Sequence, residues 1–294
     1  MIVTTYEKHR PRPRPRRRRW LRALFILALL FILLLVDSNF RIEVTQVDIA
    51  SSKIPPAFEG FTIAQLSDVH AAVFGRDNKT LIEKVKKAKP DIIAITGDII
   101  NNKDDLDIVR PLLYALVDIA PVYYVTGNHE WDSGAIKDLF ALLRDAGVRT
   151  LRNEYLPLKR DGAHILLAGI DDPNGPYDMP KPEAVVAHIR EKEGDAPYFI
   201  LLAHRNRYLP RLAPLGVDLI LAGHAHGGMI RLPFTDGLIG PSREWLPTYT
   251  SGIYTQESTT LFVSRGIGNR TGYPRFLNNP QLALLVLRSG ALVS

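Results

Sequence analysis

Five short apolar segments of this chain each end in Asp, Asn or His, and this arrangement constrains the fold more than any other feature. Stretches with helical periodicity separate the segments, so strands and helices are expected to alternate. This alternation predicts an α/β fold, in which functional side chains gather beyond the carboxyl ends of the strands. The predicted strands are 61–66, 91–95, 122–125, 198–203 and 219–222, and the predicted helices are 78–87, 106–116, 134–146 and 182–191.

The remainder of the chain is predicted to add further strands. Residues 41–49 alternate between apolar and polar side chains, as a half-buried strand does. After Gly227 the sequence becomes rich in strand-forming residues, and the predicted strands are 229–232, 249–253, 260–264 and 282–287. We find no internal repeat and no second domain boundary, and we divide the chain into a basic tail (1–19), an apolar helix (20–36) and one folded domain (37–294).

The side chains that follow the five apolar segments are of types that bind metal ions. They are Asp68 and His70, Asp98, Asn128 and His129, His204, and finally His224 and His226. A single His on an apolar strand is usually an ordinary core residue, and His9, His164 and His188 are interpreted in that way. Five of the eight histidines, however, share the position just after a predicted strand, which indicates a functional site.

These side chains offer only oxygen and nitrogen atoms, and the chain has no cysteine. Such donors suit Zn, Mn or Fe rather than Cu(I) or an iron–sulfur cluster. The candidates are too numerous for one tetrahedral ion but suit two divalent ions that share a carboxylate. Asp98 stands alone at its strand end and is the predicted bridge. Paired ions about 3.5–4 Å apart activate a hydroxide and hold the oxygens of a phosphoryl group.

The order of these motifs resembles the signature of the calcineurin-like metallophosphoesterases. Asp-x-His, Gly-Asp, Gly-Asn-His-Glu, His and Gly-His-x-His follow one another from Ser67 to His226, with 30 residues from Asp68 to Asp98 and 30 more to Asn128. The residues around 223–233, 264–266 and 275–276 are similar to a bacterial membrane-associated branch of that family. The resemblance covers roughly 41–288 and implies a four-layer αββα sandwich with metal-dependent phosphoesterase activity.

The resemblance also implies a role for each motif residue. One ion is expected to bind Asp68, His70, Asp98 and His226, and the other to bind Asp98, Asn128, His204 and His224. His129 is expected not to bind metal but to donate a hydrogen bond or a proton to the leaving-group oxygen.

Two positions depart from the family pattern. Glu130 stands where Asp is commoner, which is a mild change outside the metal ligands. His204 is followed by Arg205, Asn206 and Arg207, although a Pro is expected near position 206, and this change can alter the substrate preference.

Arginines near the motifs are candidates for binding phosphate, because a guanidinium group pairs with phosphate through two parallel hydrogen bonds. Of Arg205, Arg207, Arg231, Arg265 and Arg275, we predict that Arg265 and Arg275 bind the substrate. The sequence contains no Gly-x-Ser-x-Gly motif, no Walker A motif and no catalytic cysteine.

The N-terminal region is predicted to attach the protein to a membrane. Residues 20–36 are apolar except for Arg22 and follow a cluster of basic residues. The positive-inside rule places this cluster in the cytoplasm and the domain on the other side of a single-pass membrane helix. In the alternative interpretation, a signal is cleaved near residues 36–38 and the domain is exported.

The basic character of the chain belongs to its N-terminus. Residues 1–22 hold nine Lys and Arg and one acid, a charge of +8, so the total of +6 leaves −2 for the remaining residues. A domain that binds nucleic acid normally carries the positive charge on its own surface, so we expect no nucleic acid partner. No obligate protein partner is inferred.

Three functions remain open from the sequence. The first is hydrolysis of phosphate mono- or diesters by metal-activated hydroxide. The second is pyrophosphate cleavage of a nucleotide-linked lipid precursor, such as UDP-2,3-diacylglucosamine, which the apolar residues Phe234 and Trp245 and the membrane segment make plausible. The third is a catalytically silent scaffold, which we disfavour because such relatives usually lose ligands and this chain keeps them together with His129.

Overall fold

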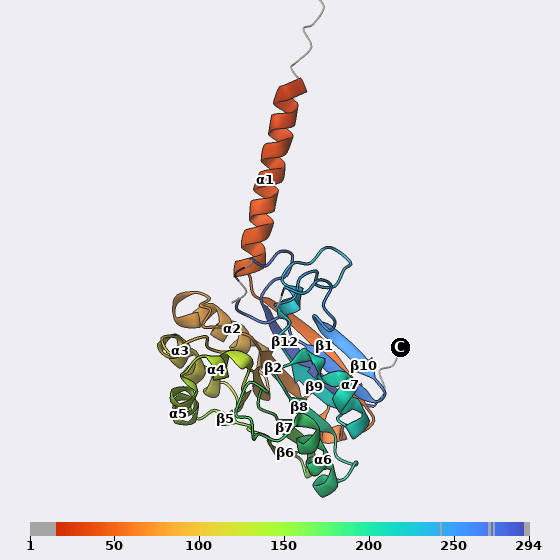
Figure 1. Cartoon of the computed structure of the whole chain (residues 1–294). Coiled ribbons are helices and arrows are strands. Elements are labelled where there is room, and N and C mark those ends of the chain that lie inside the picture. Colours follow the sequence, from red (N-terminus) through yellow and green to blue (C-terminus); the bar gives the residue numbers. More distant parts are fainter. Residues whose placement is uncertain (1–15, 242, 270–271, 273, 291–294) are drawn as a thin grey trace, which may run out of the picture.

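Two six-stranded sheets lie face to face at the centre of the molecule (Figure 1). The computed structural model describes residues 16–290 except 242, 270–271 and 273. In spatial order, the first sheet contains β1 (Glu43–Ser51), β12 (Gln281–Ser289), β2 (Thr62–Leu66), β3 (Ile92–Thr96), β4 (Val122–Val125) and β5 (Arg149–Thr150). The second contains β10 (Gly252–Gln256), β11 (Thr259–Val263), β9 (Leu219–Ala222), β8 (Phe199–Leu202), β7 (Ala163–Gly169) and β6 (Glu154–Arg160).

The strands that precede the predicted ligands run parallel within each sheet. β2, β3 and β4 are parallel neighbours in the first sheet, and β8 and β9 are parallel neighbours in the second. Antiparallel pairs lie outside these groups, where β12 pairs with β2, β10 with β11, and β6 with β7. Parallel neighbours end at the same edge of their sheet, so each sheet brings its own ligand residues to one rim.

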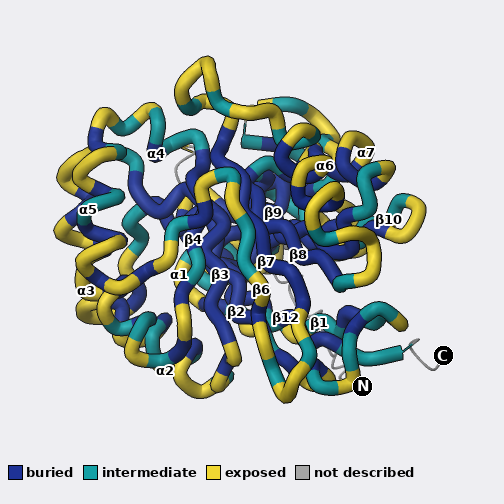
Figure 2. Tube along the Cα trace, turned by 90° about the horizontal axis from the view of Figure 1, so that it is seen from below, coloured by how far each residue is buried: buried dark blue, intermediate teal, exposed yellow. Residues whose placement is uncertain are grey.

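Helices cover the outer face of each sheet. The helices are α2 (Lys79–Ala88), α3 (Asp105–Val117), α4 (Asn128–Asp132), α5 (Ile136–Ala146), α6 (Pro182–Glu193) and α7 (Leu209–Leu212), besides an N-terminal helix, α1 (Arg16–Phe40). Apolar residues of α2, α3 and α5 pack on the first sheet, and those of α6 and α7 pack on the second. Figure 2 shows the buried strands at the centre with the exposed helical surfaces around them.

A third apolar cluster fills the space between the sheets. In β3, Ile92 and Ala94 belong to this cluster, whereas Ile93 and Ile95 face the helices. Successive strand residues point to opposite faces, so a strand that is apolar throughout must be covered on both sides. The layers are therefore helix, sheet, sheet and helix, which confirms the expected αββα sandwich.

Most of the predicted elements are present. The five strands that precede the ligand residues lie within one residue of their predicted bounds, and the four predicted helices lie within two. The predicted strand 229–232 is wrong: Ile230 and Arg231 form only isolated bridges, to Phe276 and Gly237. The strand expected at 249–253 begins later, at Gly252, and continues to Gln256. The hairpin of β6 and β7 and the short β5 were not predicted.

The apolar N-terminal segment forms most of α1, a helix that projects from the domain (Figure 1). Residues 18–40 of this helix are long and apolar enough to cross a membrane, and an 18-residue stretch within them has a mean hydropathy of 2.4. The predicted apolar segment, 20–36, lies inside the helix, and Arg16–Arg19 of the predicted basic tail also belong to it. Residues 1–15 of that tail lie outside the described residues.

The carboxyl end of α1 is bonded to the domain through the loop before β12. The side chain of Asn39 accepts from the backbone N–H of Arg275 at 3.0 Å and donates to the Arg275 carbonyl at 2.9 Å. The hydroxyl of Ser38 accepts from the N–H of Leu277 at 2.8 Å, and the rings of Phe31 and Phe276 lie 5.3 Å apart. These contacts hold the end of the helix in one position relative to the domain.

Candidate metal centre

The two sheets bring all of the predicted ligands to one rim, although these residues are spread over more than half of the chain. Asp68 and His70 follow β2, Asp98 follows β3, and Asn128 begins α4 directly after β4. From the second sheet, His204 follows β8, and His224 and His226 follow β9. The side chains of Asp68, His70, Asp98, His204 and His226 are all buried.

One group of potential ligand atoms is formed by Asp68, His70 and His226. The Nε2 atoms of His70 and His226 lie 3.2 Å apart, and Nε2 of His226 lies 3.5 Å from Oδ1 of Asp68. Three ligand atoms that converge in this way can bind a single ion.

A second group is formed by Asp98, His204 and His224. Nε2 of His204 lies 3.2 Å from Nδ1 of His224 and 3.2 Å from Oδ2 of Asp98. The same Oδ2 atom lies 3.8 Å from Nε2 of His70, which belongs to the first group. Asp98 thus lies between the two groups, where a bridging carboxylate would have to be.

Hydrogen bonds orient two of the histidines toward these groups. Nδ1 of His70 lies 2.6 Å from Oδ1 of Asn101, and Nδ1 of His204 lies 2.9 Å from the carbonyl oxygen of Thr96. Both partners are acceptors, so the Nδ1 atoms carry the ring protons and the Nε2 atoms keep their lone pairs. Histidine ligands of metal ions are commonly fixed in this way.

An unpaired atom and charges at the rim fit a pair of divalent ions. Oδ1 of Asn128 is buried without a hydrogen-bond partner among the described residues. Burial raises the pKa of Asp68 to about 6. Burial lowers the pKa of His204, but the carboxylates of Asp98 and Asp68 outweigh it and raise that pKa to about 10. Cations bound at the centre would offset the charge of these buried carboxylates.

The backbone around the rim adopts conformations that side chains usually avoid. Asp68, His70, Asp98, His224 and His226 all have φ between 48° and 67°, in the left-handed region. Such conformations cost of order 1–3 kcal/mol each and persist where surrounding structure enforces them. A Cβ added to Gly127 would collide with Oδ1 of Asp98, so only glycine allows the β4 turn to approach this carboxylate.

Glu130 joins two loops of the site, a role that its position in the sequence did not reveal. Its buried carboxylate accepts from the backbone N–H groups of Asp98 at 2.9 Å, Ile99 at 2.6 Å, Ile100 at 3.3 Å and Gly127 at 2.6 Å. One side chain therefore joins the loop after β3 to the loop after β4. Its place in the Gly-Asn-His-Glu motif indicated that Glu130 belongs to the site, but the sequence alone does not identify the groups that it binds.

Replacing Glu130 by Ala is expected to destabilise the fold and to lower the metal content. The change leaves buried N–H groups unpaired, and each unpaired group costs about 1–3 kcal/mol. A total loss of about 3 kcal/mol corresponds to a decrease in Tm of roughly 6–12 °C for a domain of this size. Thermal unfolding and elemental analysis would measure both effects, with the exposed Glu83→Ala as the control. An unchanged Tm would show that the carboxylate does not join the two loops.

His129 lies beside the rim but is less enclosed than the neighbouring histidines. Its side chain is 30% exposed, and its Nε2 atom lies 4.0 Å from Oδ2 of Asp98. Its ring stands edge-on to that of His70, with the centroids 4.9 Å apart. The distances would also let it form a ligand group with His70 and Asp98, so its role as a group that does not bind metal stays a prediction.

The two arginines expected to bind substrate have partners within the protein. The guanidinium of Arg275 is buried and donates to the carbonyl oxygens of Gly268 at 2.6 Å and His226 at 3.4 Å. Arg265 pairs with Glu43 at 2.6 Å. Phosphate binding by Arg265 and Arg275 therefore stays a prediction that these contacts do not support.

A different arginine reaches the second ligand group. NH1 of Arg205 lies 3.0 Å from Nε2 of His224, while its other nitrogens pair with Asp172 at 2.6 and 3.0 Å. Arg205 belongs to the segment after His204 in which a Pro is expected near position 206.

Known proteins are similar to this chain in sequence. A model of the calcineurin-like phosphoesterase family matches residues 61–228. An uncharacterized metallophosphoesterase of Bacillus subtilis, YkuE, is 35% identical over 254 residues, which cover 84% of this chain and 86% of that protein. An uncharacterized metallophosphoesterase of Aquifex aeolicus is 31% identical over 264 residues, which cover 85% and 93%. A bovine transmembrane protein with a metallophosphoesterase domain is 30% identical over 248 residues, which cover 76% of this chain and 52% of that protein.

Proposed function

Because this chain belongs to the calcineurin-like phosphoesterase family of metal-dependent phosphoesterases, we propose that it hydrolyses phosphate mono- or diesters at the rim shared by its two sheets. The observation that carries this proposal is the meeting of the two ligand groups at Asp98. Its Oδ2 atom lies 3.2 Å from Nε2 of His204 and 3.8 Å from Nε2 of His70.

Two divalent ions, of Mn, Zn or Fe, would supply a nucleophile derived from water and would offset the charge of the phosphoryl oxygens. In the proposed assignment, Asp68, His70 and His226 hold one ion, Asn128, His204 and His224 hold the other, and Asp98 holds both. The unpaired Oδ1 atom of Asn128 supports its inclusion, because a buried amide oxygen without a partner is otherwise costly.

His129 is proposed to stabilise and protonate the leaving-group oxygen. Its backbone N–H donates to Oδ1 of Asp98 at 2.9 Å, which places the residue directly against the proposed bridge. Its side chain is partly exposed, so a substrate can reach it, whereas His70 and His204 are enclosed. A general acid must be accessible to the leaving group in this way.

A panel of substrates tests the proposal. Purified full-length protein in detergent, loaded with Mn or Zn, is expected to hydrolyse some phosphomonoesters, phosphodiesters or lipid pyrophosphates and to lose this activity on treatment with a chelator. Failure on the whole panel with every metal, despite bound ions, would favour the scaffold interpretation instead.

We further propose that α1 holds the domain at a membrane. Within residues 18–40 the helix has a long apolar stretch, and only 6% of that stretch is buried against the rest of the protein. The contacts of Ser38 and Asn39 with the loop before β12 support an uncleaved anchor, because they join the end of the helix to the domain and cleavage after Ser38 would remove one of them. The basic residues before the helix favour a cytoplasmic N-terminus and an extracytoplasmic domain.

Removal of α1 is expected to release the protein from membranes without loss of activity. Full-length protein should sediment with membranes and resist a high-salt wash, because apolar burial rather than charge holds it. A chain that starts at Asp37 should be soluble and active on small esters. A chain that starts at Arg41 should be less stable, because it lacks the bonds of Ser38 and Asn39.

Two results of this fractionation would contradict the tether. Release of the full-length protein by salt alone would mean that attachment is electrostatic. Isolation of mature protein that begins near Asn39 would mean that the segment is a cleaved signal.

A lipid-linked pyrophosphate is the second candidate substrate, and exposed apolar side chains favour it. Leu232, Phe234, Trp245 and Leu246 are between 47% and 109% exposed and belong to the long loop between β9 and β10. This loop lies beside the end of α1 in Figure 1, on the side of the domain from which the helix projects. Lipid pyrophosphates in the same panel distinguish this candidate from small soluble esters.

A further inference from the structure

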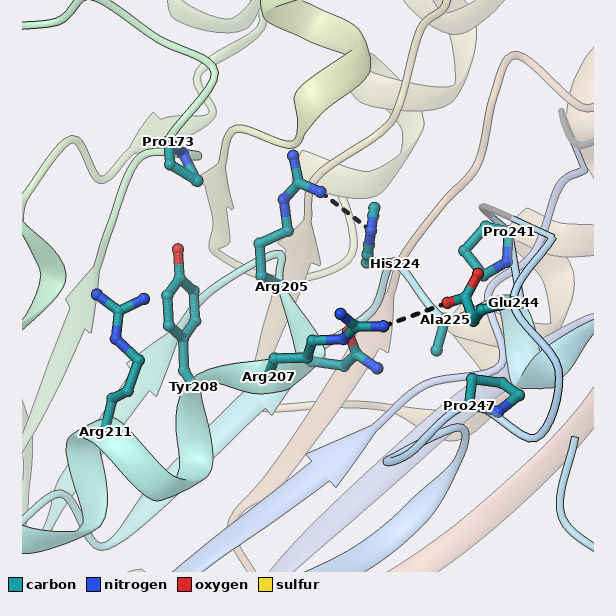
Figure 3. Close-up of a pocket in the computed structure, with 11 residues that line it drawn as sticks. Pro173, Arg205, Arg207, Tyr208, Arg211, His224, Ala225, Pro241, Glu244 and Pro247 are labelled. Carbon is teal, nitrogen blue, oxygen red and sulfur yellow. Dashed lines mark hydrogen bonds and ion pairs between the residues drawn. The ribbon is translucent and has the colours of Figure 1, made fainter. Parts of the chain in front are cut away.

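A pocket of about 600 Å³ opens directly beside the second ligand group (Figure 3). The loop between β9 and β10 forms one side of the pocket, with His224 and Ala225 at the rim and Glu244 farther along, and Tyr208 and Arg211 lie on the other side. Three arginines line it, Arg205, Arg207 and Arg211, against one acidic residue, Glu244. Each guanidinium also pairs with a carboxylate, Arg205 with Asp172, Arg207 with Glu244 and Arg211 with Glu183, so the positive charge open to a ligand depends on how firmly each pair is held.

Arg205 is held rigidly at the inner end of this pocket. The carboxylate of Asp172, which is fully buried, accepts two of its hydrogen bonds, and Oδ1 of Asn174 accepts a third at 3.1 Å. A guanidinium fixed by a buried carboxylate loses little conformational freedom when it binds another anion.

The remaining nitrogen of Arg205 is directed at His224 and is available when that histidine binds a cation. Nδ1 of His224 faces His204 and Asp98, and Nε2 faces NH1 of Arg205 at 3.0 Å. If Nδ1 gives its lone pair to an ion, the ring proton must lie on Nε2. Two donors cannot bond to each other, so NH1 of Arg205 is then left to bond an acceptor that enters the pocket.

Arg207 lies farther along the same pocket and is only weakly engaged. Its side chain is 66% exposed, and its single described contact is to Oε1 of Glu244 at 3.4 Å. The other carboxylate oxygen of Glu244 is buried without a hydrogen-bond partner. Figure 3 shows Arg207 pointing across the pocket toward Glu244, so an anionic group that enters would compete with this carboxylate for the guanidinium.

We propose that this pocket binds a second phosphate group of the substrate, so that the preferred substrates are organic diphosphates or bisphosphates. The proposal rests on hydrolysis at the adjacent rim. The scissile phosphoryl group occupies the rim, and the second phosphate lies in the pocket between Arg205 and Arg207. Charged hydrogen bonds from both arginines would favour such substrates over monophosphates.

Two substitutions with opposite expected effects test the proposal. The substrates are propane-1,3-diol bisphosphate and the corresponding monophosphate, and the measured quantity is the ratio of their kcat/KM values. Arg207→Gln is expected to lower this ratio about tenfold or more, since a hydrogen bond to a charged group contributes at least that factor. Glu244→Gln is expected to raise the ratio about twofold to fivefold, because it removes the charge of a partly exposed carboxylate that competes for Arg207.

Arg110→Gln is the matched control, because Arg110 is also exposed and pairs with an acid, Asp107, at 3.6 Å. It should leave the ratio unchanged. A general disturbance of folding would lower activity on both substrates in both pocket variants and could not produce opposite changes in the ratio. Thermal unfolding of each variant checks that the fold is retained.

Binding of methylenediphosphonate, which is not hydrolysed at its P–C–P linkage, provides a readout that does not depend on turnover. In calorimetry with the Mn-loaded full-length protein, Arg207→Gln should weaken this binding about tenfold and leave methylphosphonate binding unchanged. If the wild type hydrolyses both propanediol phosphates but neither variant changes the ratio or the binding, the second-phosphate site is overturned and the hydrolase function stands. If the wild type hydrolyses neither, calorimetry alone decides the site, and the wider substrate panel decides the hydrolase function.

Discussion

Asp98→Ala is expected to release both metal ions and to reduce hydrolysis by at least about 10³-fold, since metal ions contribute several kcal/mol of transition-state stabilisation. The physical reason is the position of this carboxylate between the two ligand groups, with Oδ2 close to Nε2 of both His204 and His70. Removal of a shared ligand weakens two sites at once and leaves the imidazoles without the anion that they surround. Elemental analysis after dialysis, together with initial rates, would measure both effects.

Two comparisons make this test specific. Asp68→Ala should remove mainly one ion, because the Asp68 carboxylate is a potential ligand only in the group formed with His70 and His226. Asp107→Ala, a change at an exposed carboxylate on α3, should alter neither metal content nor rate. An Asp98→Ala protein that still holds two ions would contradict the bridging role.

His129→Ala is expected to lower the turnover rate by about 10²–10⁴, the usual contribution of a general acid. The loss should be largest for esters with poor leaving groups, because their oxygen must be protonated as it departs. An aryl ester with a good leaving group should lose much less. Both ions should remain bound, since the proposed assignment leaves every ligand in place. Rates across a series of leaving groups, with metal analysis of the same samples, would establish this pattern.

His226→Ala provides the contrast for this experiment. It should lower the occupancy of one ion, and excess metal should partly restore activity. If His129→Ala instead empties the site, then His129 is a ligand, as its distance from Asp98 would permit. If all rates are unchanged, another group must stabilise the leaving oxygen.

The strands and the residues at their ends could be predicted because both signals are local. A run such as residues 92–95 must be buried on both faces, and the first polar residue after it marks the end of the strand. Asp98 and His204 were therefore identified from their immediate neighbours in the sequence. That they meet at 3.2 Å depends on the stacking of the two sheets, and for this the family resemblance was required.

The parts that were not predicted depend on contacts between distant residues. Glu130 accepts hydrogen bonds from backbone N–H groups in the loop after β3, and because every residue except proline has such a group, the sequence does not identify these partners. The burial of the Arg275 side chain could not be predicted from the sequence either, and its binding of phosphate stays a prediction. The segment at 229–232 has a strand-like sequence, yet it makes only isolated bridges because it forms part of the loop beside the pocket.

The number of metal ions per chain tests the central claim most directly. Metal-free full-length protein would be titrated with Mn or Zn, and bound metal and hydrolysis would be measured on the same samples. Two ions sharing Asp98 predict saturation at two ions per chain, with hydrolysis reaching its maximum only when both are bound. Saturation at one ion, or full hydrolysis in the presence of a chelator, would contradict the two-metal account.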